Sequence, residues 1–271
     1  MQVTTPFLVN VQKLEDVKKI EKVGIKTFLF ALQGFSVGYP KTFKVSDIPT
    51  HIDAYLLVNR ILDCQDIDRL KEILKSISTK IKGIVFEDIG IYNMAVEMGF
   101  EGELILWQNH FGTNKSSINF YLKRGVDGVF IASDLEESEI NTILCEVNGP
   151  VVLPIFGHNQ IAYSRRKLLS NYAEHFCLPR SKMAIMKEKI GALNLIVCEN
   201  EYGTVIYNKM AYNAWRMYGK NNVKYYFVDT VFLNIKAVIS MIQSFGEQLD
   251  NIEYDYGFLD QKTFYRLENK E

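Results

Sequence analysis

Polar side chains follow the short apolar segments of this sequence with a regularity that suggests a common site. Two histidines, His110 and His158, and the adjacent acids Glu87 and Asp88 come within a few residues of such a segment. Histidine titrates near neutral pH, and a carboxyl group among apolar residues can exchange protons there too, so both can act as general acids or bases. We therefore predict Glu87, His110 and His158 as catalytic residues, while a purely structural role stays open for each histidine.

The acidic pair needs a closer look, because adjacent side chains on a strand point to opposite faces. Glu87 and Asp88 are consecutive and follow the apolar segment Gly83–Phe86. They therefore do not form a ready-made catalytic pair. We expect one carboxylate to face the pocket and the other to cap the following helix.

Amide side chains occupy the same kind of position. Asn59, Gln108, Asn109 and Asn159 can each donate and accept hydrogen bonds, which suits a polar ligand, so we predict them as substrate-binding residues. Helix capping is the alternative for any polar residue at a strand end, and it suits Asp88, Ser133 and Asp134 best. The remaining polar residues at the ends of the predicted strands are Asn10, Gln33, Arg60 and Asp229.

A basic segment stands out near the middle of the chain. Ser164 is followed by three adjacent cations, Arg165, Arg166 and Lys167, shortly after another apolar segment. Guanidinium groups recognise carboxylates and phosphates by paired hydrogen bonds. We predict that Ser164, Arg165 and Arg166 bind substrate, either a small acidic metabolite or RNA. A solvated basic turn paired with nearby acids is the alternative.

The elements that must position these residues alternate regularly between strand and helix. Short β-branched or aromatic segments recur, and most are followed by apolar residues at helical spacing. Some of these segments are apolar on both faces, which is typical of parallel strands buried between two layers. The predicted strands are Val3–Val9, Thr27–Leu32, Ala54–Val58, Gly83–Phe86, Glu103–Trp107, Gly128–Ala132, Val151–Phe156 and Tyr225–Asp229; helices are predicted over Leu14–Val23, Ile67–Ile77, Tyr92–Met98, Ser116–Lys123, Glu136–Val147 and Leu233–Phe245.

This pattern predicts one α/β domain over residues 1–271, a TIM-barrel-like (β/α) barrel. In such barrels, ligands bind at the carboxyl ends of the strands. Residues 158–222 are too long for an ordinary connection, and Leu195–Cys198 and Thr204–Tyr207 flank a glycine-containing turn, which predicts a β-hairpin within an insert after the seventh strand. We expect this insert to help build the site, with a packing elaboration as the alternative. The tail from Asn251 alternates like a strand.

Composition narrows the classes of function. The 31 Lys and Arg against 32 Asp and Glu give a net charge of −1, so the chain is not a polycation, although a local basic patch is still compatible with nucleic acid. No apolar run approaches the roughly 18 residues of a membrane helix, and no secretory signal opens the chain, so we expect a cytoplasmic protein without a membrane partner. The four cysteines show no CxxC spacing, which argues against structural zinc and a disulfide framework. We predict no metal ligands.

Several of these segments, taken in order, resemble the collagenase-like peptidase family U32. They are Tyr55–Arg60, Gly83-Ile-Val-Phe-Glu-Asp-Ile-Gly90, Gly125–Ser133 with its following acidic helix, Ala162-Tyr-Ser-x-Arg166, and Gly203-Thr-Val-Ile-Tyr-Asn208. The resemblance spans nearly the whole chain and supports the barrel. It implies a peptidase or hydrolase by name, whereas relatives with the full signature are thought to hold an iron–sulfur cluster and to help hydroxylate RNA bases or quinone precursors.

The chain departs from the family at the residues that hold that cluster. The signature usually reads Ser-Gly-Arg-Cys, whereas Lys167 stands here at the cysteine position and only Cys177 lies nearby. Four thiolates are the usual requirement, so we predict no iron–sulfur cluster and no other cofactor, with a divalent metal left open.

Three functions follow from this reading. The first is RNA (tRNA or rRNA) modification by hydroxylation, which this chain would either perform or assist as the partner of a cluster-bearing paralogue. The second is a metal-dependent peptidase or hydrolase using Glu87, Asp88, His110 and His158. The third is a non-catalytic subunit or homo-oligomer, for which the 17 Phe and 15 Tyr could supply an interface.

Overall fold

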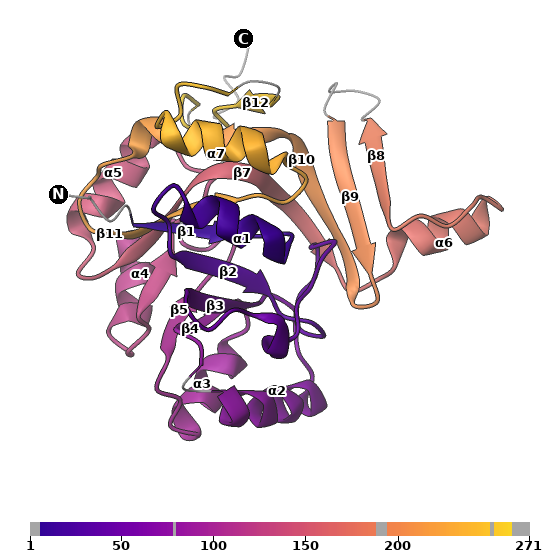
Figure 1. Cartoon of the computed structure of the whole chain (residues 1–271), viewed down its shortest axis with the longest axis horizontal. Helices are drawn as coiled ribbons and strands as arrows, with labels where there is room; N and C mark the ends of the chain where they lie inside the picture. The colour runs from indigo at the N-terminus through magenta and orange to yellow at the C-terminus, as the bar shows by residue number, and fades with distance from the viewer. Residues whose placement is uncertain (1–5, 78–79, 188–193, 250–251, 262–271) are drawn as a thin grey trace, which may run out of the picture.

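Eight parallel strands close into a barrel in the computed structural model, which describes residues 6–77, 80–187, 194–249 and 252–261. The strand order is β1-β2-β3-β4-β5-β6-β7, and β11 closes the ring by pairing with both β7 and β1. The predicted TIM-barrel-like fold is therefore confirmed (Figure 1). The barrel strands are β1 (Phe7–Asn10), β2 (Thr27–Ala31), β3 (Asp53–Val58), β4 (Gly83–Phe86), β5 (Glu103–Leu106), β6 (Gly128–Phe130), β7 (Val151–Ser164) and β11 (Val223–Asp229).

Helices cover the outside of the barrel and alternate with its strands. Most begin and end within a few residues of the predicted bounds. Gly24, Gly99 and Gly125 adopt positive φ just after α1, α3 and α4, the conformation that ends a helix most readily at glycine. The helices are α1 (Leu14–Glu21), α2 (Cys64–Ile77), α3 (Ile89–Glu97), α4 (Lys115–Leu122), α5 (Glu137–Glu146) and α7 (Ile235–Gln243), with short 3₁₀ helices η1 (Val45–Asp47) and η2 (Trp215–Met217).

Two apolar clusters hold the barrel together. The larger cluster lies between the strands and the helices around them. The smaller one contains interior strand residues such as Leu57, Val85 and Phe130, and it continues into Val205 and Tyr207, which lie outside the barrel strands. The barrel interior is thus a packed core and not a channel, and its carboxyl end is partly roofed by residues from the insert.

Strand β7 departs from the prediction, because it continues past Phe156 and leaves the barrel. Its second half pairs antiparallel with β10 (Gly203–Asn213), and β9 (Asn194–Asn200) and β8 (Met183–Lys187) follow in that sheet. Gly157 makes the exit, with a φ of +140° and so little room that a Cβ would lie 2.7 Å from the Cβ of Asp229. The sequence pattern stopped at this glycine, whereas the backbone continues as a strand.

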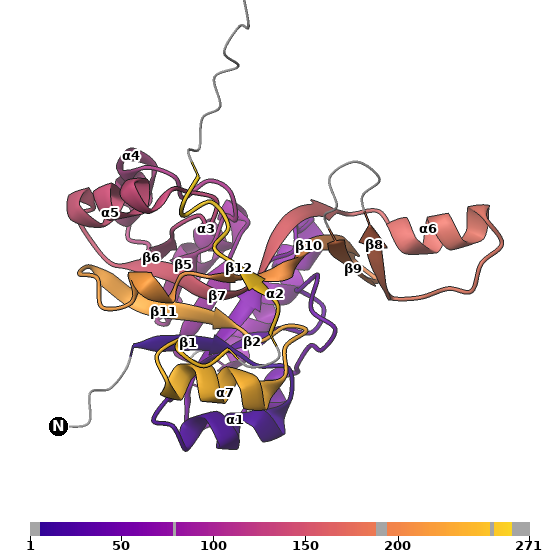
Figure 2. The same cartoon turned by 90° about the horizontal axis from the view of Figure 1, so that it is seen from above.

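The insert forms an arm on the barrel. It contains α6 (Leu168–His175) and the antiparallel strands β8, β9 and β10, so the predicted hairpin is confirmed. The arm extends sideways from the mouth of the barrel, and α6 lies at its outer end (Figure 2). This arrangement separates the inner part of the arm, which touches the barrel, from a far part that does not.

The chain ends differ in detail from the prediction. The first strand begins at Phe7, and the earlier residues of the predicted Val3–Val9 segment lie partly outside the described residues. In the predicted tail strand, only Tyr254–Asp255 pairs, as β12 with β10, and residues beyond 261 lie outside the description. Within the described ranges, no helix combines the length and apolar character needed to cross a membrane.

Candidate functional site

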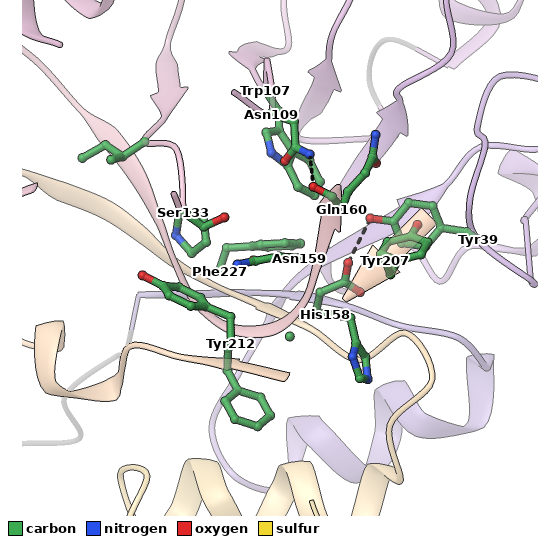
Figure 3. A pocket seen from close by; sticks show the side chains of 15 residues that line it. Tyr39, Trp107, Asn109, Ser133, His158, Asn159, Gln160, Tyr207, Tyr212 and Phe227 are labelled. Atoms are coloured by element: carbon green, nitrogen blue, oxygen red, sulfur yellow. Dashed lines mark hydrogen bonds between the residues drawn. The ribbon is translucent and has the colours of Figure 1, made fainter. Parts of the chain in front are cut away.

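A cavity opens at the carboxyl end of the barrel, where β5, β6 and β11 end and β7 leaves the barrel beside β10 (Figure 3). Its enclosed part is small, with about 30 Å³ for the centres of water-sized molecules, and the space between its lining atoms reaches about 470 Å³ when the part open to solvent is counted. One wall is aromatic: the ring of Trp107 stacks on Phe130 at 4.6 Å between centroids and meets Phe227 edge-on at 5.0 Å. Concave, mostly apolar sites with a few polar groups are where proteins bind small ligands.

Polar side chains surround this aromatic wall. Asn109, Ser133, Asn159 and Gln160 all line the cavity and are partly exposed. Asn109 donates from Nδ2 to the carbonyl of Gln160 at 3.0 Å, which fixes the end of β5 against the outgoing strand β7. The rim therefore offers donors and acceptors on a scaffold of two strand ends.

Asp229 is the buried carboxylate of the cavity. It ends β11, accepts a hydrogen bond from the Tyr39 hydroxyl at 3.0 Å, and accepts another from the backbone N–H of Val231 at 3.0 Å. Burial raises the pKa of Asp229 to about 6, although the two hydrogen bonds oppose the rise. The carboxyl group thus changes charge just below neutral pH.

A second acid, Glu87, and a histidine, His110, lie at the same end of the barrel but are not among the residues that line the cavity. Burial raises the pKa of Glu87 to about 7; the positive charge of His110 opposes this rise and the neighbouring Asp88 adds to it. His110 Nδ1 lies 3.2 Å from Oδ2 of Asp134, and this hydrogen bond raises the pKa of His110, with burial acting in the opposite direction. Two groups that titrate near neutral pH thus feel each other's charge, as an acid–base pair requires.

His158 is placed differently. Its Nδ1 lies 3.0 Å from the carbonyl oxygen of Asn208, and its ring meets Phe232 edge-on at 5.9 Å. Burial lowers the pKa of His158, so the ring is uncharged at neutral pH. His158 lines the cavity as a neutral hydrogen-bonding group.

Three of the predicted residues are engaged in structural hydrogen bonds. Asn59 is buried, and its amide exchanges two hydrogen bonds with the backbone of Val37, which pins the loop after β2 over the barrel. Gln108 accepts from the Tyr121 hydroxyl at 3.3 Å and faces α4 instead of the cavity. Asp88 caps α3 by accepting from Gly90 N–H at 2.8 Å, as expected for one member of the acidic pair.

The basic segment lies away from the cavity. β7 carries Ser164 about 20 Å beyond Gly157 at the usual rise per residue, and Arg165, Arg166 and Lys167 follow it, exposed, on the arm. Ser164 accepts only the N–H of Arg166, at 3.2 Å. In the part of the chain that the structure describes, none of the three cations forms an ion pair, so the alternative of a basic turn paired with acids finds no support.

Several residues of the site were not among the predicted ones. Tyr39 comes from the loop after β2, Tyr207 and Tyr212 come from β10, and Trp107 and Phe227 look like ordinary core residues in the sequence. Asp229 and Ser133 appeared only as strand-end residues. The aromatic residues gave no signal, because an aromatic in a strand predicts packing before it predicts a cavity wall.

The described residues show no set of side chains suited to hold a metal ion or a cluster. Cys64, Cys145 and Cys177 are exposed and unpaired, Cys198 is buried, and burial raises the pKa of its thiol to about 11. Among the described residues, no group of three or more His, Cys, Asp or Glu side chains gathers as metal ligands would. Glu87, Asp88, His110 and His158 therefore do not form the metal-holding set of the hydrolase hypothesis, and Lys167 stands where the signature cysteine would be.

Comparison with solved structures gives two distant likenesses. The C-terminal domain of a putative chitinase from Desulfitobacterium hafniense DCB-2 has 11% identity and a TM-score of 0.42, covering 90% of this chain and 99% of that one. A chitinase from Chromobacterium violaceum ATCC 12472 has 9% identity and a TM-score of 0.40, covering 89% and 99%. Likenesses at this level say nothing of the activity. No functionally curated protein matches the chain.

A family comparison is more informative. The sequence pattern of Peptidase family U32 matches residues 12–180, which is more than half of the chain. The matched range runs from the end of β1 through the barrel and into the arm, and it includes Glu87, His110, His158 and the basic segment. The chain belongs to peptidase family U32.

Proposed function

We propose that this chain acts in RNA modification by hydroxylation, or assists it, with the reacting part of the substrate at the barrel mouth and the RNA backbone along the arm. The observation that carries the proposal is the distribution of charge. Residues 165–203 contain seven Lys and Arg against four Glu, whereas the whole chain has a net charge of −1. A basic projection on an otherwise acidic protein is the electrostatic footprint of a polyanion partner.

The barrel mouth supports the proposal from the chemical side. Glu87, with a pKa of about 7, and His110, bonded to Asp134, can hold or release protons near neutral pH. Such groups suit a reaction in which a proton leaves or joins a heterocycle or a water molecule. His158 and the amides of the rim would orient the substrate.

Deletion of the gene followed by profiling of modified nucleosides in tRNA and rRNA tests the proposal. We expect one hydroxylated nucleoside to decrease or disappear and to return when the intact gene is restored. Restoration with Glu87→Gln or with Arg165→Gln/Arg166→Gln should fail to bring it back. An unchanged nucleoside profile after deletion contradicts the proposal.

A hydrolase is the second candidate, and the acid–base pair favours it. Glu87 could activate a water molecule at the same end of the barrel while His110 protonates a leaving group. Incubation of the purified chain with gelatin and with peptide libraries, with and without added divalent metal, distinguishes it from the first proposal. Cleavage that is lost in Glu87→Gln supports the hydrolase.

A further inference from the structure

One buried hydroxyl beside the cavity has no hydrogen-bonding partner in the described part of the chain. Tyr212 is only 2% exposed, comes from β10, and lines the cavity near Ser133 (Figure 3). Its hydroxyl meets no partner, and neither does the buried Oδ1 of Asp134, whose charge acts on the Tyr212 hydroxyl. A buried polar atom left unpaired costs about 1–3 kcal/mol, so it is kept where something else satisfies it.

The neighbouring side chains on the rim are also free to bind. Ser133 and Asn159 make no side-chain hydrogen bond to any residue that the structure describes, although many other buried or half-buried polar groups do. Together with Tyr212 they form a polar edge in the same cavity as the aromatic residues Trp107 and Phe227. A wall that stacks and an edge that hydrogen-bonds select a flat ring with polar substituents.

The charge of the cavity restricts the ligand further. No lysine or arginine is among its lining residues. His158 is uncharged at neutral pH because burial lowers its pKa. Each oxygen of the buried Asp229 carboxylate already accepts one hydrogen bond, from Tyr39 or from Val231, so the group repels an anion and is poorly placed to form an ion pair with a ligand.

We infer that the barrel mouth binds one neutral planar ring bearing an amide-like donor and acceptor, with the Tyr212 hydroxyl and the side chains of Ser133 and Asn159 on its polar edge. Anionic groups of a ligand, such as phosphates or carboxylates, stay outside the cavity. The inference rests on the proposed function in placing the substrate at the barrel mouth. The cavity would therefore hold the reacting ring of the substrate, and the small acidic metabolite would not bind there.

The preference for a neutral ring can be tested on the intact chain with three probes of nearly equal shape: neutral benzamide, anionic benzoate and cationic benzamidine. Ligand-observed NMR titration at pH 7.5 should show saturable binding of benzamide and at least tenfold weaker binding of both charged compounds, because each brings an uncompensated charge into a partly buried site. Equal or tighter binding of benzoate or benzamidine overturns the inference, and so does the absence of benzamide binding.

Tyr212→Phe tests the hydroxyl, and Tyr207→Phe is its matched control. The Tyr207 hydroxyl also lies at the cavity but donates to the carbonyl of Gly38 at 3.0 Å. We expect Tyr212→Phe to weaken benzamide binding about five- to tenfold, as the loss of one hydrogen bond does, while the melting temperature stays the same or rises. Tyr207→Phe should lower the melting temperature.

A Tyr212→Phe variant that melts lower, as Tyr207→Phe does, or that binds benzamide like the wild type contradicts the inferred role of this hydroxyl. These measurements involve no RNA. Gene deletion can therefore abolish a nucleoside modification even if the cavity does not prefer neutral rings. The cavity can also prefer neutral rings even if the modification is unchanged.

Discussion

His110 and Asp134 follow neighbouring strands, β5 and β6, and the imidazole Nδ1 lies 3.2 Å from the carboxylate Oδ2. The carboxylate fixes the orientation of the ring and favours its charged form, which raises the pKa of His110. Through its charge, the ring in turn opposes the rise of the Glu87 pKa. Glu87 and His110 therefore influence each other's titration, and changing one should be visible in the other.

Asp134→Asn should lower the pKa of His110, because the substitution removes the negative charge and leaves a weaker acceptor for the imidazole. The midpoint of the His110 ring-proton shift during a pH titration by NMR measures this directly. His158 serves as an internal control, since its pKa is set by burial and by the Asn208 carbonyl and should not move. An unchanged His110 midpoint contradicts the ion pair.

Glu87→Gln should change how stability depends on pH. In the folded chain the Glu87 pKa is about 7, above the ordinary 4.5, so the group stabilises the fold fully below pH 4.5 and loses that contribution as the pH rises through 7. Glutamine does not titrate. The stability of the variant relative to the wild type should therefore rise by about 1–3 kcal/mol between pH 4.5 and pH 8.

Urea denaturation of both proteins at pH 4.5, 6 and 8 measures this difference. Asp88→Ala is the control, because Asp88 caps α3 and its removal should lower stability by about 1 kcal/mol through the lost cap. If the free energies of unfolding of Glu87→Gln and the wild type change with pH in the same way, the raised pKa of Glu87 is contradicted.

Gly157→Ala should destabilise the chain at the point where β7 leaves the barrel. The φ of +140° is strained for any other residue, and a Cβ would also lie 2.9 Å from the carbonyl oxygen of Asp229. Gly219→Ala is the matched control, since Gly219 has a φ of +84° but nothing within 4 Å of a Cβ. We expect a loss of about 1 kcal/mol at Gly219 and about 3 kcal/mol at Gly157, measured by chemical denaturation. Equal losses would show that backbone strain alone explains both.

The same glycine shows where the sequence could and could not predict the structure. Strand and helix periodicity gave the barrel, because each βα unit buries its own apolar stripe and leaves that stripe in the sequence. The continuation of β7 depended instead on pairing with β10, from Ser164 with Thr204 to Phe156 with Asn213, across a long stretch of chain. The hydrophobic pattern of a short segment cannot predict its pairing with a strand so far away in the sequence.

The candidate site divides along a similar line. Residues that follow their own strand, such as Glu87 and His110, could be placed at the carboxyl end of the barrel because the carboxyl ends of parallel strands meet there; their catalytic role stays a prediction. Tyr212 reaches the cavity only through β10, and Asn59 turns to the Val37 backbone because the loop after β2 folds back over it. Both outcomes depend on contacts between segments far apart in the sequence.

Glu199→Ala should release α6 from the arm and leave the barrel intact. Glu199 is buried in β9 and accepts the backbone N–H of Leu169 at 2.7 Å and that of Ser170 at 3.2 Å, so it caps α6 from another strand. Hydrogen exchange of the α6 amides should accelerate by about one to two orders of magnitude, corresponding to a loss of about 1–3 kcal/mol. The exposed neighbour Glu201→Ala is the control. Unchanged exchange in α6 contradicts the cap.

Neutralising the basic segment should weaken RNA binding without affecting the fold. The triple variant Arg165→Gln/Arg166→Gln/Lys167→Gln removes exposed cations that form no ion pair with the described residues, so the melting temperature should stay within experimental error. If each cation contacts one phosphate, the slope of log affinity against log salt should fall by about 2, given roughly 0.7 per phosphate of a single strand. Titration of tRNA at several salt concentrations by fluorescence anisotropy measures both affinity and slope.

The control for this variant removes the same charge elsewhere on the surface. Lys13→Gln/Lys18→Gln/Lys22→Gln changes three exposed lysines at and beside α1, on the barrel and away from the arm. A non-specific polyanion effect would reduce binding equally in both triple variants, because only the total charge would matter. A loss confined to the arm variant places the RNA backbone on the arm, whereas equal losses, or none, remove the arm from RNA recognition.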